Sequence, residues 1–172
     1  TGLDEKAIRD TIRLNLRQLI VFMKKTERIH DFFYDTFKIA ADEKYGNYNG
    51  MLLDYFKSVA DPNGNYSFSN SSENNIRGLN ELPYHLNQSE DYEELSRVLS
   101  SFSFIKNKLQ LSNIDNLISD YSFAENNDAI VGGDDSIMLI AEALNLSRPI
   151  LANEENKNQL PGQLWGRLCQ ED

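Results

Sequence analysis

Apolar residues recur at helical spacing along most of the chain from residue 48 onward. Tyr48, Met51, Leu52, Tyr55, Phe56 and Val59 follow the i, i+3, i+4 series of an amphipathic helix and predict one buried face. Similar series predict further helices, whose inward positions are Ile76, Leu79, Leu82 and Leu86; Tyr92, Leu95, Val98 and Leu99; Phe102, Ile105 and Leu109; Ile114, Leu117, Ile118 and Tyr121; and Leu160, Leu164, Trp165 and Leu168. Residues 136–146 predict one more. Helices with short connections are typical of stacked antiparallel pairs.

Polar residues predict where these helices begin and end. Ser89 is predicted to start one helix, with two acidic residues in its first turn, and Ser112 is predicted to cap another. Pro83 lies within a helical pattern and predicts a kink there. Residues 61–72 and 126–135 are rich in Asn, Ser, Asp or Gly and predict loops.

The first 46 residues follow a different pattern. They predict a helix over 7–19, a buried strand over 19–23, a polar turn over 24–27 and a second strand over 28–30. Asp31 is then predicted to be the N-cap of a helix that ends near Gly46. A helix followed by a strand pair is the second half of a winged helix. The sequence therefore predicts a mainly α fold with a short β-hairpin, divided into a winged-helix portion at 1–46 and a domain of stacked helices at 47–172.

Composition excludes several classes of protein. The 172 residues carry a net charge of −10, which argues against a nucleic-acid surface. No apolar run approaches the roughly 20 residues of a membrane-spanning helix, and the single Cys169 excludes a disulfide framework. Residues 1–45 are nearly neutral, whereas 46–172 carry eight basic and nineteen acidic residues. This contrast predicts a solvated acidic surface on a helical domain, and the alternative is that the near-neutral opening segment packs on a different partner, such as a preceding domain. Because the chain starts at Thr1 without Met, it is expected to be part of something longer.

Most candidate chemistry has a structural interpretation. The segment Asp61–Asn65 is similar to the start of a calcium loop, but Tyr66 replaces the required glycine, so it predicts a turn. His85 is expected to be a packed structural histidine, and Cys169 has no histidine nearby. Two histidines and one cysteine, widely separated, do not make a zinc site. No acid, base or nucleophile pair stands out, so the chain is not expected to be an enzyme.

His30 is the one residue that the pattern places at a promising position. It is predicted to lie between a strand and a helix N-terminus, where an imidazole can donate a hydrogen bond to a phosphate held by a neighbouring domain. Asp31 would cap the helix and help to orient the ring. The alternative is a histidine at the end of a hairpin without any ligand.

Four segments carry a family resemblance. Ile29-His30-Asp31 resembles the Met-His-Asp motif in the winged-helix domain of STAND ATPases, the NB-ARC and NACHT families, with Ile in place of Met. Three later segments resemble NACHT proteins with WD repeats and relatives of apoptotic protease-activating factor. They are Met51–Phe56, Arg77–Leu86 and Gln159–Leu168. Asn49-Gly50 departs from the family, which often has a basic pair there, and no phosphate-binding loop is present in this sequence.

The resemblance implies a function for the whole stretch. In that family the motif histidine contacts the β-phosphate of ADP, and the helical stretch joins the ATPase core to a WD-repeat propeller. It implies a cytoplasmic, non-catalytic regulatory and scaffold segment of a signalling ATPase. ADP or ATP would be bound by the parent protein, with His30 and Asp31 as cofactor-binding candidates. The partners would be the neighbouring nucleotide-binding and WD-repeat domains and other proteins.

The alternative is a stand-alone helical-repeat module for protein–protein interaction. This alternative predicts that exposed aromatic residues, such as Tyr84, Tyr92 or Trp165, line one concave surface and hold a peptide or another protein. A linker predicts that the same residues are buried between helices.

Overall fold

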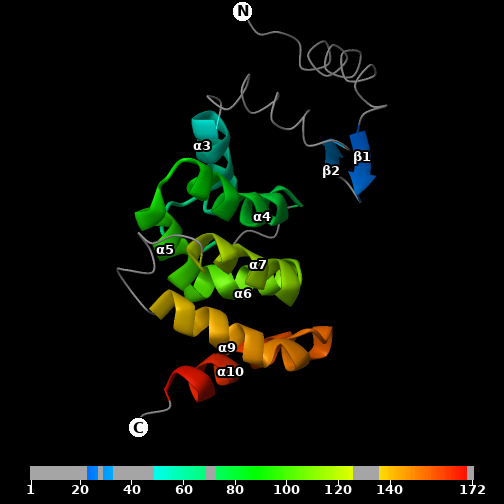
Figure 1. The fold of residues 1–172 in the computed structure, drawn as a ribbon, viewed down its shortest axis with the longest axis vertical. Helices are drawn as coiled ribbons and strands as arrows, with labels where there is room; N and C mark the ends of the chain where they lie inside the picture. The colour runs from blue at the N-terminus through cyan, green and yellow to red at the C-terminus, as the bar shows by residue number, and fades with distance from the viewer. Residues whose placement is uncertain (1–22, 27–28, 33–48, 69–72, 126–135, 170–172) are drawn as a thin grey trace, which may run out of the picture. The chain divides into compact units, whose positions relative to one another are not determined.

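The computed structural model describes residues 23–26, 29–32, 49–68, 73–125 and 136–169 (Figure 1). The chain divides into two compact units, Thr1–Asn47 and Tyr48–Asp172. That the first unit is a winged-helix portion stays a prediction, because the helices expected at 7–19 and after Asp31 lie outside the described residues.

The described part of the first unit is an antiparallel strand pair. Strand β1 spans Met23–Thr26 and β2 spans Ile29–Phe32, with Lys25 opposite His30 in the register. The prediction of a polar turn over 24–27 is therefore wrong for residues 24–26, which belong to strand β1. Polarity is a weak guide in this case because a strand of an antiparallel pair can carry polar residues as readily as a turn can.

The second unit is mainly helical, as the sequence predicts. Its elements are α3 (Asn49–Ala60), α4 (Glu73–Gln88), α5 (Tyr92–Ser100), α6 (Phe102–Leu111), α7 (Ile114–Glu125), α9 (Ser136–Leu151), the 3₁₀ helix η3 (Glu154–Gln159) and α10 (Leu160–Leu168). The helices stack in chain order (Figure 1): α3 packs on α4, α4 on α5 and α7, α7 on α9, and α9 on α10. One apolar core runs through the stack, from Leu53 on α3 to Leu164 on α10.

Two helix starts differ from the prediction. Helix α5 begins after Asp91, whose carboxylate accepts a hydrogen bond from the Glu94 N–H. Ser89 cannot start it, because the Ser89 N–H still donates to the His85 carbonyl at the end of α4. At α7 the cap is Asn113, whose side chain accepts from the Asn116 N–H at 2.8 Å. The Ser112 N–H instead donates to the Lys108 carbonyl oxygen at the end of α6. In both places the preceding helix uses the predicted cap residue.

The buried face of α3 also differs from the prediction. Leu53, Phe56 and Ala60 are buried, whereas Met51 and Tyr55 are exposed. The helix carries two overlapping apolar series, and α4 covers the one that includes Leu53 and Ala60. Spacing predicts which residues share a face, but the packing partner decides which face is buried.

Helices α3 and α4 approach each other closely at Gly78. A Cβ atom at Gly78 would lie 2.9 Å from the backbone nitrogen of Ala60. One turn earlier on α4, the Asn75 side-chain NH₂ donates to the Ala60 carbonyl at 3.0 Å and to the Val59 carbonyl at 3.2 Å. These bonds satisfy carbonyls that the end of α3 leaves without a helical partner. A small residue and a side-chain cap thus fix the α3–α4 pair.

Candidate functional site

His30 and Asp31 both lie in strand β2, where His30 is opposite Lys25 and Asp31 is opposite Lys24. The prediction that Asp31 is an N-cap is wrong, because a residue paired in a strand ladder is not the residue that begins a helix. The backbone places His30 one residue after the start of the strand. Its predicted role toward a phosphate stays a prediction, as does that of Asp31.

His85 has a structural role in the second unit. Its ring is buried and stacks on Phe56 with 4.9 Å between ring centroids. Nδ1 lies within hydrogen-bond distance of the Asn49 side-chain oxygen, and the Asn49 NH₂ donates back to the His85 carbonyl at 3.2 Å. Burial lowers the pKa of His85, and the nearby charge of Arg77 lowers it further. A neutral imidazole that donates from Nδ1 fits these contacts, so His85 joins α3 to α4.

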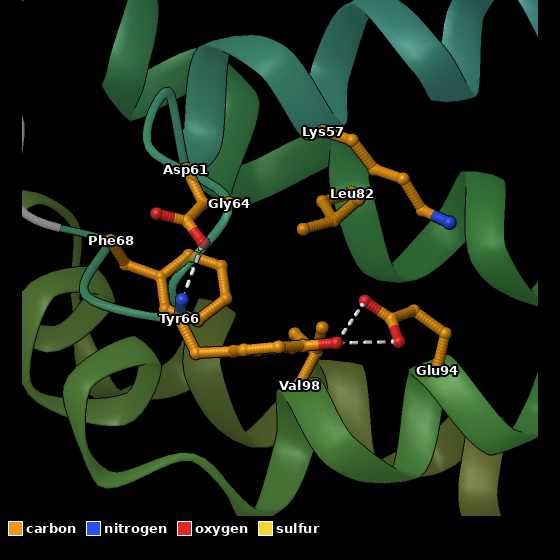
Figure 2. A pocket seen from close by; sticks show the side chains of 8 residues that line it. All are labelled: Lys57, Asp61, Gly64, Tyr66, Phe68, Leu82, Glu94 and Val98. Atoms are coloured by element: carbon orange, nitrogen blue, oxygen red, sulfur yellow. Dashed lines mark hydrogen bonds between the residues drawn. The ribbon is translucent and has the colours of Figure 1, made fainter.

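A hollow of about 160 Å³ lies beside the turn that follows α3, and Figure 2 shows the side chains that line it. It is lined by Lys57, Asp61, Gly64, Tyr66, Phe68, Leu82, Glu94 and Val98. Asp61 accepts a hydrogen bond from the Tyr66 N–H, and the Tyr66 hydroxyl donates to Glu94 at 2.9 Å. These bonds hold the turn predicted at 61–65 in a conformation where Gly64 and Tyr66 both have positive φ.

Most polar groups around this hollow make contacts within the domain, but Asp61 Oδ1 is buried there without a hydrogen-bond partner. Lys57 donates to Asp91 at 3.2 Å, and Glu94 accepts from both Tyr66 and Arg97. The apolar wall formed by Leu82 and Val98 has room for about one side chain. The hollow therefore has the size and contacts of a packing defect beside a turn, and it contains no pair of groups poised for acid–base chemistry.

The strongest electrostatic feature lies inside the core. Lys108 on α6 and Asp120 on α7 form a buried ion pair, and the Lys108 ammonium lies 5.7 Å from the centre of the Phe104 ring. Burial raises the pKa of Asp120 to about 6, although Lys108 opposes the shift. Burial also lowers the pKa of Lys108 against the pull of Asp120. Beside the pair, the Tyr121 hydroxyl donates to the Leu99 carbonyl at 2.8 Å. The pair is enclosed, so its role is in packing.

The aromatic residues that could discriminate a linker from a peptide binder give a divided result. Tyr92 packs partly buried against the core, whereas Tyr84 is exposed and Trp165 is 73% exposed. Tyr84 lies on α4 and Trp165 on α10. Neither residue lines the hollow of Figure 2 or the two hollows beside α9.

Spacing placed several apolar residues in the interior that the structure leaves at the surface. Met51 and Leu52 on α3 and Trp165 on α10 are examples, and Leu139 and Leu146 on α9 are exposed as well. One sequence signal could have found the α9 residues. Residues 137–141 are all apolar, and a helix packed on one side cannot bury every direction at once.

The second unit is an α-helical domain with an apolar core and small surface hollows. Within the described ranges, no group of three or more His, Cys, Asp or Glu residues is placed to hold a metal ion. None of the helices described there is both long and apolar enough to span a bilayer.

A comparison with protein-family models then matches residues 54–151 to the APAF-1 helical domain. Because this match covers more than half of the chain, the chain belongs to that family. Neither the curated proteins nor the solved structures gave a match. The matched range runs from the middle of α3 to the end of α9. The hairpin, η3 and α10 lie outside it.

Proposed function

We propose that the chain is a non-catalytic regulatory and scaffold segment of a STAND-type signalling ATPase. It would relay the ADP or ATP state of a nucleotide-binding core to a C-terminal sensor domain built of WD repeats. The observation that carries this proposal is membership of the APAF-1 helical-domain family over residues 54–151. The domain is a non-catalytic part of proteins of that type.

The packing of the second unit supports a mechanical role. Helices α3 and α10 lie at opposite ends of the stack (Figure 1), and one apolar core connects them. Ties between successive layers include the His85–Phe56 stack, the Lys108–Asp120 ion pair and the bond from Lys157 to the Ser112 carbonyl at 2.7 Å. A close-packed body of this kind rotates as a unit, so a movement at one end is transmitted to the other.

Within this proposal, His30 reads the phosphate of ADP bound to the neighbouring core, and Asp31 is the second candidate at that contact. The support is the resemblance of Ile29-His30-Asp31 to the family motif, together with the position of His30 in a short hairpin. Contact with His30 would favour the ADP-bound, closed state, because a ligand shifts an equilibrium by its differential affinity for the two states.

Nucleotide content tests this function. The full-length protein that contains this segment would be purified without added nucleotide and denatured, and the released ADP and ATP would be quantified by chromatography. We expect the wild type to retain ADP and His30→Ala to retain at least fivefold less. Lys25→Ala is the matched control, because Lys25 is opposite His30 in the same hairpin, and it should retain ADP like the wild type. Nucleotide-free wild type, or equal retention in His30→Ala, would overturn the proposal.

The stand-alone interaction module remains the second candidate, and the exposure of Trp165 and Tyr84 favours it. It predicts that the full-length protein holds no nucleotide. It also predicts that Trp165→Ala and Tyr84→Ala weaken binding to a protein partner while the helical content is unchanged.

A further inference from the structure

Helix α9 has a ridge on its outer side that carries two exposed leucines. Its inner side, which includes Ile137, Ala141 and Leu144, is buried in the core. Leu139, Glu142 and Leu146 follow one another at i, i+3 and i+7, so they share one face, and we call them the α9 ridge. Leu139 is 55% exposed and Leu146 is 56% exposed. A single exposed leucine needs no explanation, but two on one helix face beside hollows mark a surface that another molecule can cover.

A hollow lies on each side of the α9 ridge. The first has a volume of about 640 Å³ and extends toward the end of α7, where Glu125 lines it together with Met138, Ala141 and Asn145 of α9. The second has a volume of about 340 Å³ and extends toward α10, where it is lined by Arg167 and Leu168. The three ridge residues line both hollows. A ridge with a hollow on either side is the shape onto which another helix packs, ridge into groove.

The charges at this face favour a cationic occupant. Glu125 and Glu142 line the hollows and form no ion pair with the part of the chain that the structure describes. Arg167 is held inside the domain, because its guanidinium donates to the Ser147 hydroxyl at 2.8 Å and to the Leu146 carbonyl at 3.2 Å. The whole second unit carries eight basic and nineteen acidic residues. Two copies of it would repel each other, whereas a basic partner would be attracted.

We infer that the α9 ridge and its two hollows bind a basic amphipathic helix of a partner protein. Apolar side chains of that helix fill the hollows beside Leu139 and Leu146. Its lysine or arginine side chains reach Glu125 at the edge of the first hollow and Glu142 between the two leucines. This is the helix-in-groove mode, in which apolar contacts give most of the affinity and rim charges give orientation and rate of association. The inference does not depend on the nucleotide relay.

The test uses the whole 172-residue chain and a synthetic helical peptide of 16 residues. The peptide carries leucine at i, i+3, i+4, i+7 and i+11 and lysine on both flanks, and a second peptide has glutamate in place of every lysine. Binding would be measured by fluorescence anisotropy at two salt concentrations, and protection of backbone amides from hydrogen exchange would locate the contact. We expect the basic peptide to bind and to protect α9, α10 and the end of α7, and the acidic peptide to bind at least tenfold more weakly.

Matched variants separate this face from general attraction to an acidic protein. Leu139→Gln with Leu146→Gln should weaken binding at least tenfold, whereas Met51→Gln with Leu52→Gln, on the exposed side of α3, should leave it unchanged. Glu125→Gln with Glu142→Gln should weaken it severalfold and reduce its salt dependence, more than Glu90→Gln with Glu155→Gln does. The inference is overturned if the basic peptide fails to bind, if the α3 pair and the α9 pair have equal effects, or if protection falls outside α9, α10 and the end of α7. It is also overturned if the chain dimerises through Leu139 and Leu146.

Discussion

Lys108 and Asp120 place opposite charges in contact inside the core, with side chains that are 1% and 7% exposed. Removing two charges from water costs several kcal/mol each, and their mutual attraction repays this only when geometry and hydrogen bonds are favourable. The pKa shifts of both partners have desolvation as their largest cause. The pair therefore specifies how α6 meets α7 more than it stabilises the domain.

Breaking the pair on one side should cost more than removing it entirely. Lys108→Met alone leaves a buried carboxylate, and Asp120→Val alone leaves a buried ammonium, so each single variant should lose about 3 kcal/mol of unfolding free energy. At pH 7 the double variant should lie within about 1 kcal/mol of the wild type, because no unpaired charge remains. Urea unfolding followed by circular dichroism measures all four proteins. Additive losses in the double variant would contradict this account.

Stability should also depend on pH through Asp120. Its pKa in the folded state is raised from 3.8 to about 6, so the folded state binds a proton more tightly than the unfolded state does. The stabilising contribution is complete below pH 3.8 and is lost as pH rises through about 6. The measurement is the difference in unfolding free energy between the wild type and the Lys108→Met, Asp120→Val double variant at pH 4 and pH 7. A difference that does not change with pH would rule out the shift.

Gly78→Ala should destabilise the α3–α4 contact by about 1 to 3 kcal/mol. The added Cβ would lie 2.9 Å from the Ala60 nitrogen, which is backbone and cannot rotate away. Gly166→Ala on α10 is the control, because nothing lies within 4 Å of a Cβ there. In that helical position alanine should stabilise by about 0.5 to 1 kcal/mol. Thermal unfolding of both variants tests this prediction, and equal changes of the melting temperature in the same direction would contradict the close approach of α3 and α4 at Gly78.

His85 should titrate with a pKa below 6.5 in the folded protein. Burial and then Arg77 disfavour the imidazolium, so the stability that His85 contributes is present above pH 6.5 and is lost as pH falls through its folded pKa. NMR titration can assign it easily, since the chain has only two histidines. His85→Phe, which keeps a ring on Phe56, should remove this resonance and this part of the acid sensitivity. A titration at or above 6.5 would contradict the buried, neutral state.

Much of the helical domain could be predicted from residue spacing. Leu79, Leu82 and Leu86 on α4, and Leu95, Val98 and Leu99 on α5, are buried where their series predicted. Helix limits were harder to predict, because a serine such as Ser89 is a good cap wherever it stands, and only the length of α4 shows that Asp91 is the residue used.

The candidate surfaces were less accessible to prediction. The motif that contains His30 was found from sequence, but its hairpin register was not, since polar residues occur both in turns and in exposed strands. The α9 ridge could not be predicted from the sequence, because an apolar residue such as leucine is expected to lie in the core wherever it occurs. Which leucines stay outside depends on where α7 and α10 lie.

The sequence by itself determined the class of this protein, because helical periodicity and net charge are properties of the chain alone. The likeness of its segments to the apoptotic protease-activating factor relatives is also present in the residues, and the family match over 54–151 supports it. Only the tertiary structure decided which face of α3 is buried, that Lys108 meets Asp120, and that Leu139 and Leu146 face outward. Each of these depends on the position of a second helix, and a pattern of residues along one helix carries no information about that position.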